Sequence, residues 1–261
     1  MNALAARRRH PAAIALLLFV GLVVVGGAYS LLAPKTASAT VATADDVTAG
    51  RELFLANCAT CHGIQAQGTK YGPALPGVGA AAVDFQVSTG RMPLAGPNVQ
   101  APRIEQVKFS EDQIRQMAAY VATLAPGPGI PDTKYTEGED GEVAMGGELF
   151  RVNCAMCHNF AGSGGALTRG KYAPSLYGVE GKYVYEAMLT GPQSMPVFSD
   201  SNMSPESKND IIAYLKTVEN QQNVGGMNLG NLGPVSEGMF VWIFALALMI
   251  ACAFWLGQKA A

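Results

Sequence analysis

Two uninterrupted apolar runs bound the chain, and the region between them has the mixed polar and apolar spacing of short helices. The runs extend over Ala12–Leu32 and Met239–Leu256, and neither contains a charged residue. At a rise of about 1.5 Å per residue each can cross a hydrocarbon core of roughly 30 Å, the second only just. The pattern predicts transmembrane helices over 12–33 and 239–257, with residues 1–11 as a cytoplasmic N-terminus.

Four segments between the runs are predicted as helices. Gly50–Ala59 and Gly146–Ala155 are short and amphipathic, whereas Ser110 and Ser204 have the character of helix caps. Each serine is followed by an acid or a proline in the first turn. Apolar residues then recur at helical spacing after both caps: Ile114, Met117, Ala118 and Val121 after the first, and Ile211, Ile212, Leu215 and Val218 after the second.

Charged residues set the expected orientation. Arg7–Arg9 precede the first run and Lys259 follows the second, so both ends are expected on the cytoplasmic side of a cell membrane. Residues from about 33 to 238 hold 14 of the 18 basic and all 20 acidic residues, a net charge of −6. This region is expected on the outer face. Its mildly acidic balance lacks the basic face of nucleic-acid binding, so no such partner is expected.

The first run also permits a second interpretation, as a cleaved signal peptide. Ala37-Ser38-Ala39 would serve as the small-residue cleavage site. The run of about 20 residues is longer than the usual signal core of roughly 7 to 15, which favours a retained anchor. Either interpretation exports the middle of the chain.

Four of the five cysteines form two Cys-x-x-Cys pairs, each followed by histidine: Cys58-Ala59-Thr60-Cys61-His62 and Cys154-Ala155-Met156-Cys157-His158. This is the attachment pattern of c-type haem, in which both thiols add to the vinyl groups and the histidine is held beneath the iron. A zinc site, a thioredoxin-like pair or a disulfide requires no histidine after both pairs. The sequence predicts two covalently bound haem c groups. The fifth cysteine, Cys252, is expected to be a packing residue, with lipidation as the alternative.

The two motifs belong to an internal repeat. Glu52-Leu53-Phe54 and Glu148-Leu149-Phe150 correspond at an offset of 96 residues. Further correspondences keep the same order: Tyr71–Leu75 with Tyr172–Leu176, Arg91-Met92-Pro93 with Ser194-Met195-Pro196, and Ala119-Tyr120 with Ala213-Tyr214. One supersecondary unit used twice predicts two domains, over 46–125 and 143–222. The linker 126–142 between them begins with a Pro/Gly-rich, hinge-like stretch.

Each unit resembles a class I c-type cytochrome domain along its whole length. The resemblance implies an all-α fold, with two tandem class I domains between N-terminal and C-terminal transmembrane helices. It makes His62 and His158 the proximal ligands of the haem irons and assigns Met92 and Met195 as the sixth ligands. Histidine/methionine ligation raises the iron potential and suits an electron carrier. Packing methionines are the alternative, and Met203 is the alternative ligand in the second unit.

The resemblance also implies partners for the two histidines. The backbone carbonyls of Pro73 and Pro174 would accept a hydrogen bond from the free ring nitrogen, which fixes the tautomer; simple loop shaping is the alternative. His62 to Pro73 spans 11 residues, whereas His158 to Pro174 spans 16. The extra loop could alter exposure of the second haem edge. Several residues are either propionate contacts or ordinary surface residues: Lys70, Tyr71, Arg91, Lys171 and Tyr172.

The ends of the chain point to a family. The strip 223–238 is too glycine-rich for a helix and too apolar for a free linker. The order of anchor, two haem units, glycine-rich strip and anchor, with Gly-Pro-Val-Ser-Glu-Gly before the last span, resembles the dihaem cytochrome c subunit of the actinobacterial cytochrome bc1 complex. The resemblance implies a membrane-anchored electron carrier within a quinol–cytochrome c oxidoreductase, a translocase, with no bond chemistry on this chain.

The resemblance further implies the partners. Electrons from menaquinol would reach the first haem through a Rieske iron–sulfur protein and leave the second for a terminal cytochrome c oxidase. Cytochrome b, membrane lipid and a dimeric complex complete the expected assembly. The principal alternative is a dihaem subunit of another complex, either a cbb3-type oxidase or a periplasmic dehydrogenase. A non-redox receptor stabilised by disulfides or zinc is weaker, as is a dihaem peroxidase, which needs an open iron site.

Overall fold

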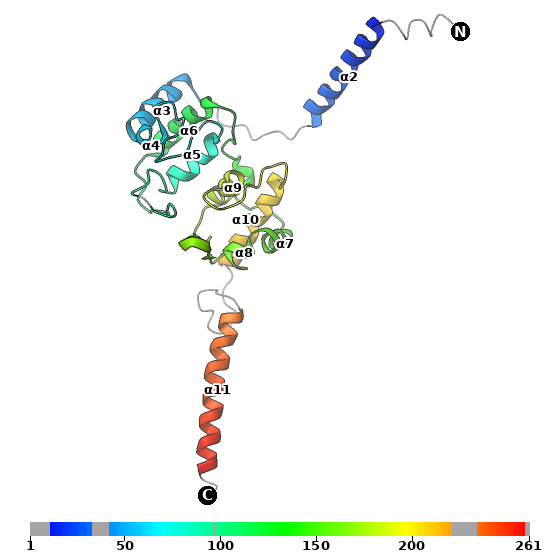
Figure 1. Cartoon of the computed structure of the whole chain (residues 1–261). Helices are drawn as coiled ribbons and strands as arrows, with labels where there is room; N and C mark the ends of the chain where they lie inside the picture. The colour runs from blue at the N-terminus through cyan, green and yellow to red at the C-terminus, as the bar shows by residue number, and fades with distance from the viewer. Residues whose placement is uncertain (1–10, 33–41, 97, 221–233, 259–261) are drawn as a thin grey trace, which may run out of the picture. The chain divides into compact units, whose positions relative to one another are not determined.

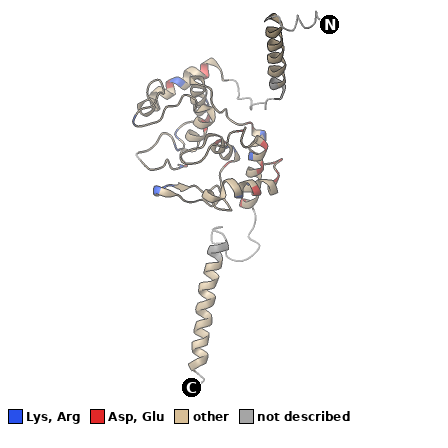
Figure 2. Cartoon of the chain, turned by 45° about the vertical axis from the view of Figure 1, so that its right-hand side comes forward, with Lys and Arg blue, Asp and Glu red and all other residues tan. Residues whose placement is uncertain are grey.

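The computed structural model describes residues 11–32, 42–96, 98–220 and 234–258 (Figure 1). The chain divides into two compact units, Met1–Ser38 and Ala39–Ala261. The first unit contains helix α2, Pro11–Leu32, close to the predicted span of 12–33. Figure 2 shows no charged residue on its described part.

The first domain of the second unit has four helices: α3 (Ala44–Asn57), α4 (Ala59–His62), α5 (Gly79–Ser88) and α6 (Glu111–Leu124). Helix α3 starts six residues earlier than predicted because Thr43 and Asp46 form a capping box. The predicted cap Ser110 forms another with Gln113, and the predicted apolar face of α6 is buried. Helix α3 packs against α6, so the first and last helices of the unit lie together.

The second domain repeats this arrangement with additions. Its main helices are α7 (Val143–Asn153), α8 (Ala155–His158), α9 (Gly181–Thr190) and α10 (Pro205–Asn220), and α7 packs against α10. The additions are the 3-10 turns η1 (Thr133–Tyr135) and η2 (Thr168–Gly170), and the strands β1 (Gly165–Ala166) and β2 (Tyr172–Ala173).

The expectation of an all-α fold holds only in part, because the chain also contains these two short strands. They pair antiparallel, with Gly165 opposite Ala173 and Ala166 opposite Tyr172. They lie within the longer loop between His158 and Pro174, whose five additional residues allow the chain to fold back on itself. The molecule is therefore mostly helical, with one short ladder beside the second attachment motif.

Matching contacts hold the helix pair of each domain. A Cβ atom on Gly50 would lie 1.9 Å from the Gln116 carbonyl oxygen, and one on Gly146 would lie 1.9 Å from that of Asp210. Only glycine permits such a close helix crossing. The rings of Phe54 and Tyr120 are 5.4 Å apart, and those of Phe150 and Tyr214 are 5.5 Å apart. Both are repeat-related pairs.

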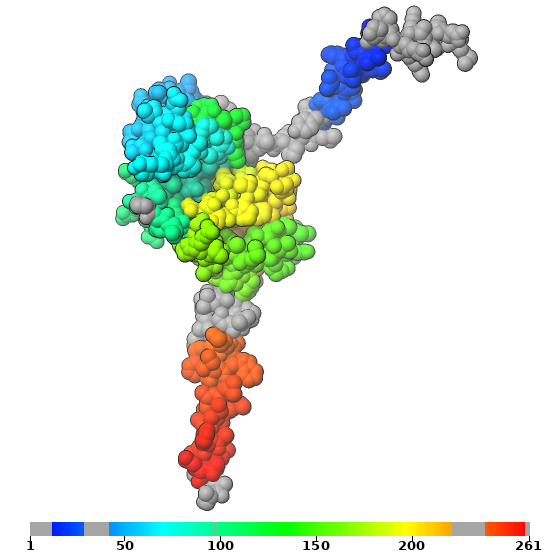
Figure 3. Space-filling view, in the orientation of Figure 1, coloured from blue at the N-terminus to red at the C-terminus, as the bar shows by residue number. Residues whose placement is uncertain are grey.

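The two domains contact each other through α5 and α9 (Figure 3). Ala81 of α5 is fully buried and belongs to the core cluster of the second domain. Lys182 of α9 forms an ion pair with Asp84 of α5. The linker, expected to be hinge-like, packs against the start of α5, where the Ala81 amide donates to the Pro128 carbonyl oxygen at 3.1 Å.

Helix α11, Pro234–Gln258, begins earlier than the predicted 239–257. The end of the glycine-rich strip is thus helical, consistent with proline at the first helical position; residues 223–233 lie outside the described residues. Among the described residues, one helix, over Gly238–Gln258, is long and apolar enough to cross a membrane, and the apolar stretch Ala12–Ala28 of α2 is shorter. Cys252, expected to pack, is exposed on α11 in this single chain.

Candidate haem sites

Both Cys-x-x-Cys-His motifs adopt the same short helical turn at the end of the first helix. The His62 amide donates to the Cys58 carbonyl oxygen at 2.9 Å, and the His158 amide donates to that of Cys154 at the same distance. Both cysteines and the histidine of each motif therefore lie on a single helical turn. All four motif cysteines are free thiols in this structure.

The histidines lie against the prolines that the sequence singled out. His62 Nδ1 is 2.8 Å from the Pro73 carbonyl oxygen, and His158 Nδ1 is 3.0 Å from that of Pro174. Since a carbonyl accepts, Nδ1 carries the proton in each pair and Nε2 is left with a free lone pair. A neutral imidazole in this tautomer can ligate a metal through Nε2.

Burial acts on the ionisable groups of the motifs. It raises the pKa of the Cys154 thiol to about 12 and also raises that of Cys58, with the neighbouring cysteine of each pair as the smaller cause. Burial likewise lowers the pKa of His158, and its bond to Pro174 opposes this shift. The surroundings thus disfavour thiolate and imidazolium, and suit thioether sulfurs and a neutral histidine ligand.

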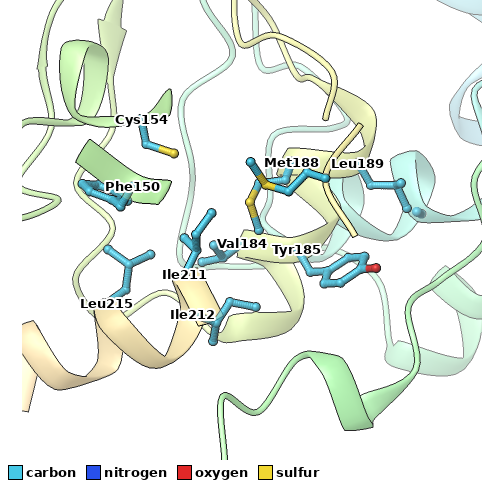
Figure 4. Packing of buried hydrophobic residues seen from close by; sticks show 11 residues of the cluster. Phe150, Cys154, Val184, Tyr185, Met188, Leu189, Ile211, Ile212 and Leu215 are labelled. Carbon is cyan, nitrogen blue, oxygen red and sulfur yellow. The ribbon is translucent and has the colours of Figure 1, made fainter. Parts of the chain in front are cut away.

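A cavity opens beside the second motif. Its walls come from α7, α9 and α10, and include Phe150, Val184, Met188, Ile211 and Leu215. In Figure 4 the sulfur of Cys154 points toward the side chain of Met188, and Val184 and Ile211 lie below them in the view. Cys154, Cys157 and His158 also line the cavity, as does Pro174. An apolar cavity next to two thiols and an imidazole fits a covalently attached haem.

Three methionines lie in or near this region and are compared as candidates for the sixth ligand of the second haem iron. Met195, the predicted sixth ligand, lines the cavity, and Met188 does so too, from helix α9. Met203, the alternative ligand, is buried in the core cluster and absent from the described lining. Its position favours packing. Met188 was missed because its helical spacing marks it as an ordinary core residue.

At the first motif, a cysteine and the predicted methionine ligand also lie against one core cluster. Met92 and Cys58 both pack against one core cluster, formed by Val87, Ile114 and Met117. Met117 is 2% exposed on α6, consistent with the packing position predicted for it. Within the described residues, three or more His, Cys, Asp or Glu side chains nowhere gather as a metal-binding cluster.

Residues of the first domain also line the cavity beside the second motif, and the sequence did not predict this. They are Phe85, Thr89, Arg91, Gln100 and Arg103. Gln100 binds the backbone of Tyr172 twice: its amide nitrogen donates to the carbonyl oxygen at 2.8 Å, and its amide oxygen accepts from the Tyr172 amide at 3.0 Å. These partners are 72 residues apart, and nothing in the local pattern of either segment predicts the contact.

Comparison with known protein families identifies both domains. Residues 47–125 match the model described as Cytochrome c, and residues 141–215 match the one described as Cytochrome C oxidase, cbb3-type, subunit III. Two such domains imply covalently bound haem c, and their number is consistent with two haems. The Cbb3-type cytochrome c oxidase subunit CcoP of Azospirillum sp. is 29% identical, over 58% of this chain and 55% of its own length.

Closer relatives match along almost the whole chain. The cytochrome bc1 complex cytochrome c subunit of Corynebacterium diphtheriae is 44% identical, over 96% of this chain and 95% of that protein. The subunit of the same name from Mycobacterium leprae is 44% identical, over 94% of this chain and 87% of that protein. Identity at this level across both full lengths shows that the chain belongs to the family of cytochrome c subunits of the cytochrome bc1 complex.

Proposed function

We propose that this chain holds two covalent haems and passes electrons from a Rieske iron–sulfur protein to a terminal cytochrome c oxidase. Cys58 and Cys61 would attach the first haem, and Cys154 and Cys157 the second. The observation that carries the haem sites is the repeated contact between histidine Nδ1 and a proline carbonyl, at 2.8 and 3.0 Å, and membership of the bc1 cytochrome c subunit family supports the electron partners. When bound, haem c supplies one-electron transfer.

The residues around each site suit a carrier. His62 and His158 would ligate the haem irons through Nε2, with their rings held by the Pro73 and Pro174 carbonyls. Met92 and Met195 would supply the sixth ligands, so that protein side chains complete the coordination of each iron. With no open position for a substrate, this chain would perform no bond chemistry. Within the bc1 complex, a quinol–cytochrome c oxidoreductase, menaquinol oxidation would belong to other subunits.

The proposed setting is a respiratory supercomplex in the cell membrane. Helices α2 and α11 would both span the membrane, with the haem domains on its outer face, in keeping with the basic residues at both ends of the chain. Cytochrome b, the Rieske protein and the oxidase would be the partners, within a dimeric assembly. A cbb3-type oxidase subunit is the second candidate, favoured by the match of residues 141–215 to that family.

Purification in mild detergent tests this setting. We expect c-, b- and a-type haem bands in one sample, together with cytochrome b and Rieske subunits. A sample with a c-type haem band and with cbb3-type or dehydrogenase partners, in place of cytochrome b and Rieske subunits, would retain the carrier and reject its proposed complex. The ligands are tested with Met195→Leu, which should leave two haems attached and lower the potential of the second. An unchanged potential and spectrum would mean that another residue is the ligand.

A further inference from the structure

Two arginines of the first domain lie in the wall of the second haem cavity. Arg91 and Arg103 line the same space as His158 and Met195, although both belong to the other half of the repeat. Arg91 is half-buried, and its guanidinium carbon is 4.6 Å from the centre of the Phe85 ring, which is itself 4% exposed. The cation is therefore held against an apolar wall rather than extended into solvent.

The two arginines have no acidic partner in the part of the chain that the structure describes. The ion pairs there involve Lys182, Lys208, Lys216 and Arg115. Both guanidinium groups line the same cavity, so two positive charges lie near each other there. Two neighbouring cations without a counter-charge destabilise a folded site. An anion bound between them would remove that cost.

The loop that carries the arginines is fixed to the rim of this cavity. Gln100, three residues before Arg103, binds both backbone groups of Tyr172 in strand β2. Near Arg91, the Ile104 amide donates to the Thr89 carbonyl oxygen at 3.3 Å, which ties the two ends of the loop together. Contacts across the domain boundary thus place both guanidinium groups at the second site.

We propose that Arg91 and Arg103 bind the propionate carboxylates of the haem attached to the second domain, so that the first domain completes that site. This inference rests on the proposed attachment at Cys154 and Cys157. Haem is an apolar macrocycle with two carboxylates, which matches an apolar cavity with two unpaired guanidinium groups at its wall. Arginine's planar fork binds carboxylates through paired charge-assisted hydrogen bonds.

The proposal has a consequence for the potential of the second haem. Positive charge near the iron disfavours the oxidised form, which carries one more positive charge than the reduced form. Both arginines therefore raise the potential of the second haem. Arg91 is also the neighbour of Met92, the proposed ligand of the first haem, so Arg103 gives the cleaner test.

The experiment compares Arg103→Gln, Arg91→Gln and their double variant in the purified full-length complex. Spectroelectrochemical titration resolves two haem components, and the component that Met195→Leu lowers is the second haem. We expect each arginine variant to lower this component, and the double variant to lower it further. Arg103→Lys should restore part of the shift. Arg51→Gln, which removes an exposed arginine from α3 of the same domain, should leave both potentials unchanged.

Haem content per chain is measured on each sample, so that a lost haem is not mistaken for a shifted potential. If Arg103→Gln matches Arg51→Gln, or if Arg91→Gln moves only the first haem, the proposal is overturned and the arginines serve domain packing alone. Absence of covalently attached haem from the unsubstituted chain would instead reject the proposed function. The two failures are therefore distinguishable.

Discussion

The two haem domains share one ligand geometry but differ in how much protein covers it. In the first domain Cys58 is half-buried and Cys61 is exposed, whereas in the second Cys154 is buried and Cys157 is half-buried. The second motif is covered by its longer loop, with strands β1 and β2, and by residues of the first domain. The repeat therefore preserves ligand positions, while the insertion and the domain interface set the surroundings.

Removing the attachment cysteines of one domain should have the largest effect on this comparison. We expect Cys154→Ala with Cys157→Ala to leave one covalent haem per chain and to unfold the second domain, because a small domain depends on the macrocycle for its core. The matched pair Cys58→Ala and Cys61→Ala should lose the other haem. The pyridine haemochrome assay, normalised to protein, counts the haems. A variant that still held two covalent haems would show that the motif is not the attachment site.

The glycines at the helix crossings test whether the domains depend on equivalent packing. Gly50→Ala and Gly146→Ala should each destabilise their own domain by about 1–3 kcal/mol or more, because the added methyl group overlaps a backbone carbonyl. Pulse proteolysis in urea, with mass spectrometry of the fragments, reports which domain opens. Gly96→Ala is the control, since a Cβ atom there meets nothing within 4 Å. Equal stability of Gly146→Ala and Gly96→Ala would contradict the close crossing.

The domain interface contains a buried carboxyl that should make stability depend on pH. Glu186 of α9 is fully buried, and burial, followed by the charge of Asp84, raises its pKa from 4.5 to about 10. With the carboxyl ionised, neither of its oxygens has a hydrogen-bond donor among the described residues. A protonated Glu186 could donate a hydrogen bond to the carboxylate of Asp84, which also pairs with Lys182.

The stability of the folded protein should fall as pH rises, because the pKa of Glu186 is higher in the folded protein than in the unfolded chain. Between about pH 5 and pH 10 the folded protein keeps a proton on Glu186 that the unfolded chain releases, so stability falls as pH rises. The slope is at most about 1.4 kcal/mol per pH unit. Glu186→Gln should flatten this dependence in pulse proteolysis of the second domain, whereas Glu148→Gln, on the surface of α7, should not. A slope unchanged by Glu186→Gln would show that Glu186 is not the titrating group.

Local sequence determined most of the helices. The spacing of Ile114, Met117 and Val121 predicted a helix face that is indeed buried, and Ser110 predicted its start. The repeat aligned Phe54 with Phe150 and Tyr120 with Tyr214, and the structure shows the same ring contact between these residues in each domain. The family resemblance, rather than spacing, led to Pro73 and Pro174, whose carbonyls lie within hydrogen-bonding distance of the histidines.

The features that sequence reasoning missed depend on contacts between distant segments. Strand β2 needs a partner strand in a loop that is mostly glycine and polar residues, which gives no period-two signal. The contact of Gln100 with Tyr172 and the position of Arg103 in the wall of the cavity beside the second motif depend on how the two domains pack. A repeat aligns each domain with the other but contains no information about the face on which they meet.

The smallest expected difference lies at the first turn of each domain. Thr43 caps α3, and its side chain accepts from the Asp46 amide at 3.1 Å, whereas Glu142, at the equivalent position before α7, makes no side-chain cap. Thr43→Ala should therefore destabilise the first domain by about 1 kcal/mol. Glu142→Ala should change the second by less than about 0.5 kcal/mol, because the Glu142 contact to Asp210 is made by its backbone amide. Urea midpoints from pulse proteolysis separate the two variants. An equal loss of unfolding free energy in both variants would mean that the Glu142 side chain stabilises the first turn of α7. The first helices of the two domains would then be capped to the same extent.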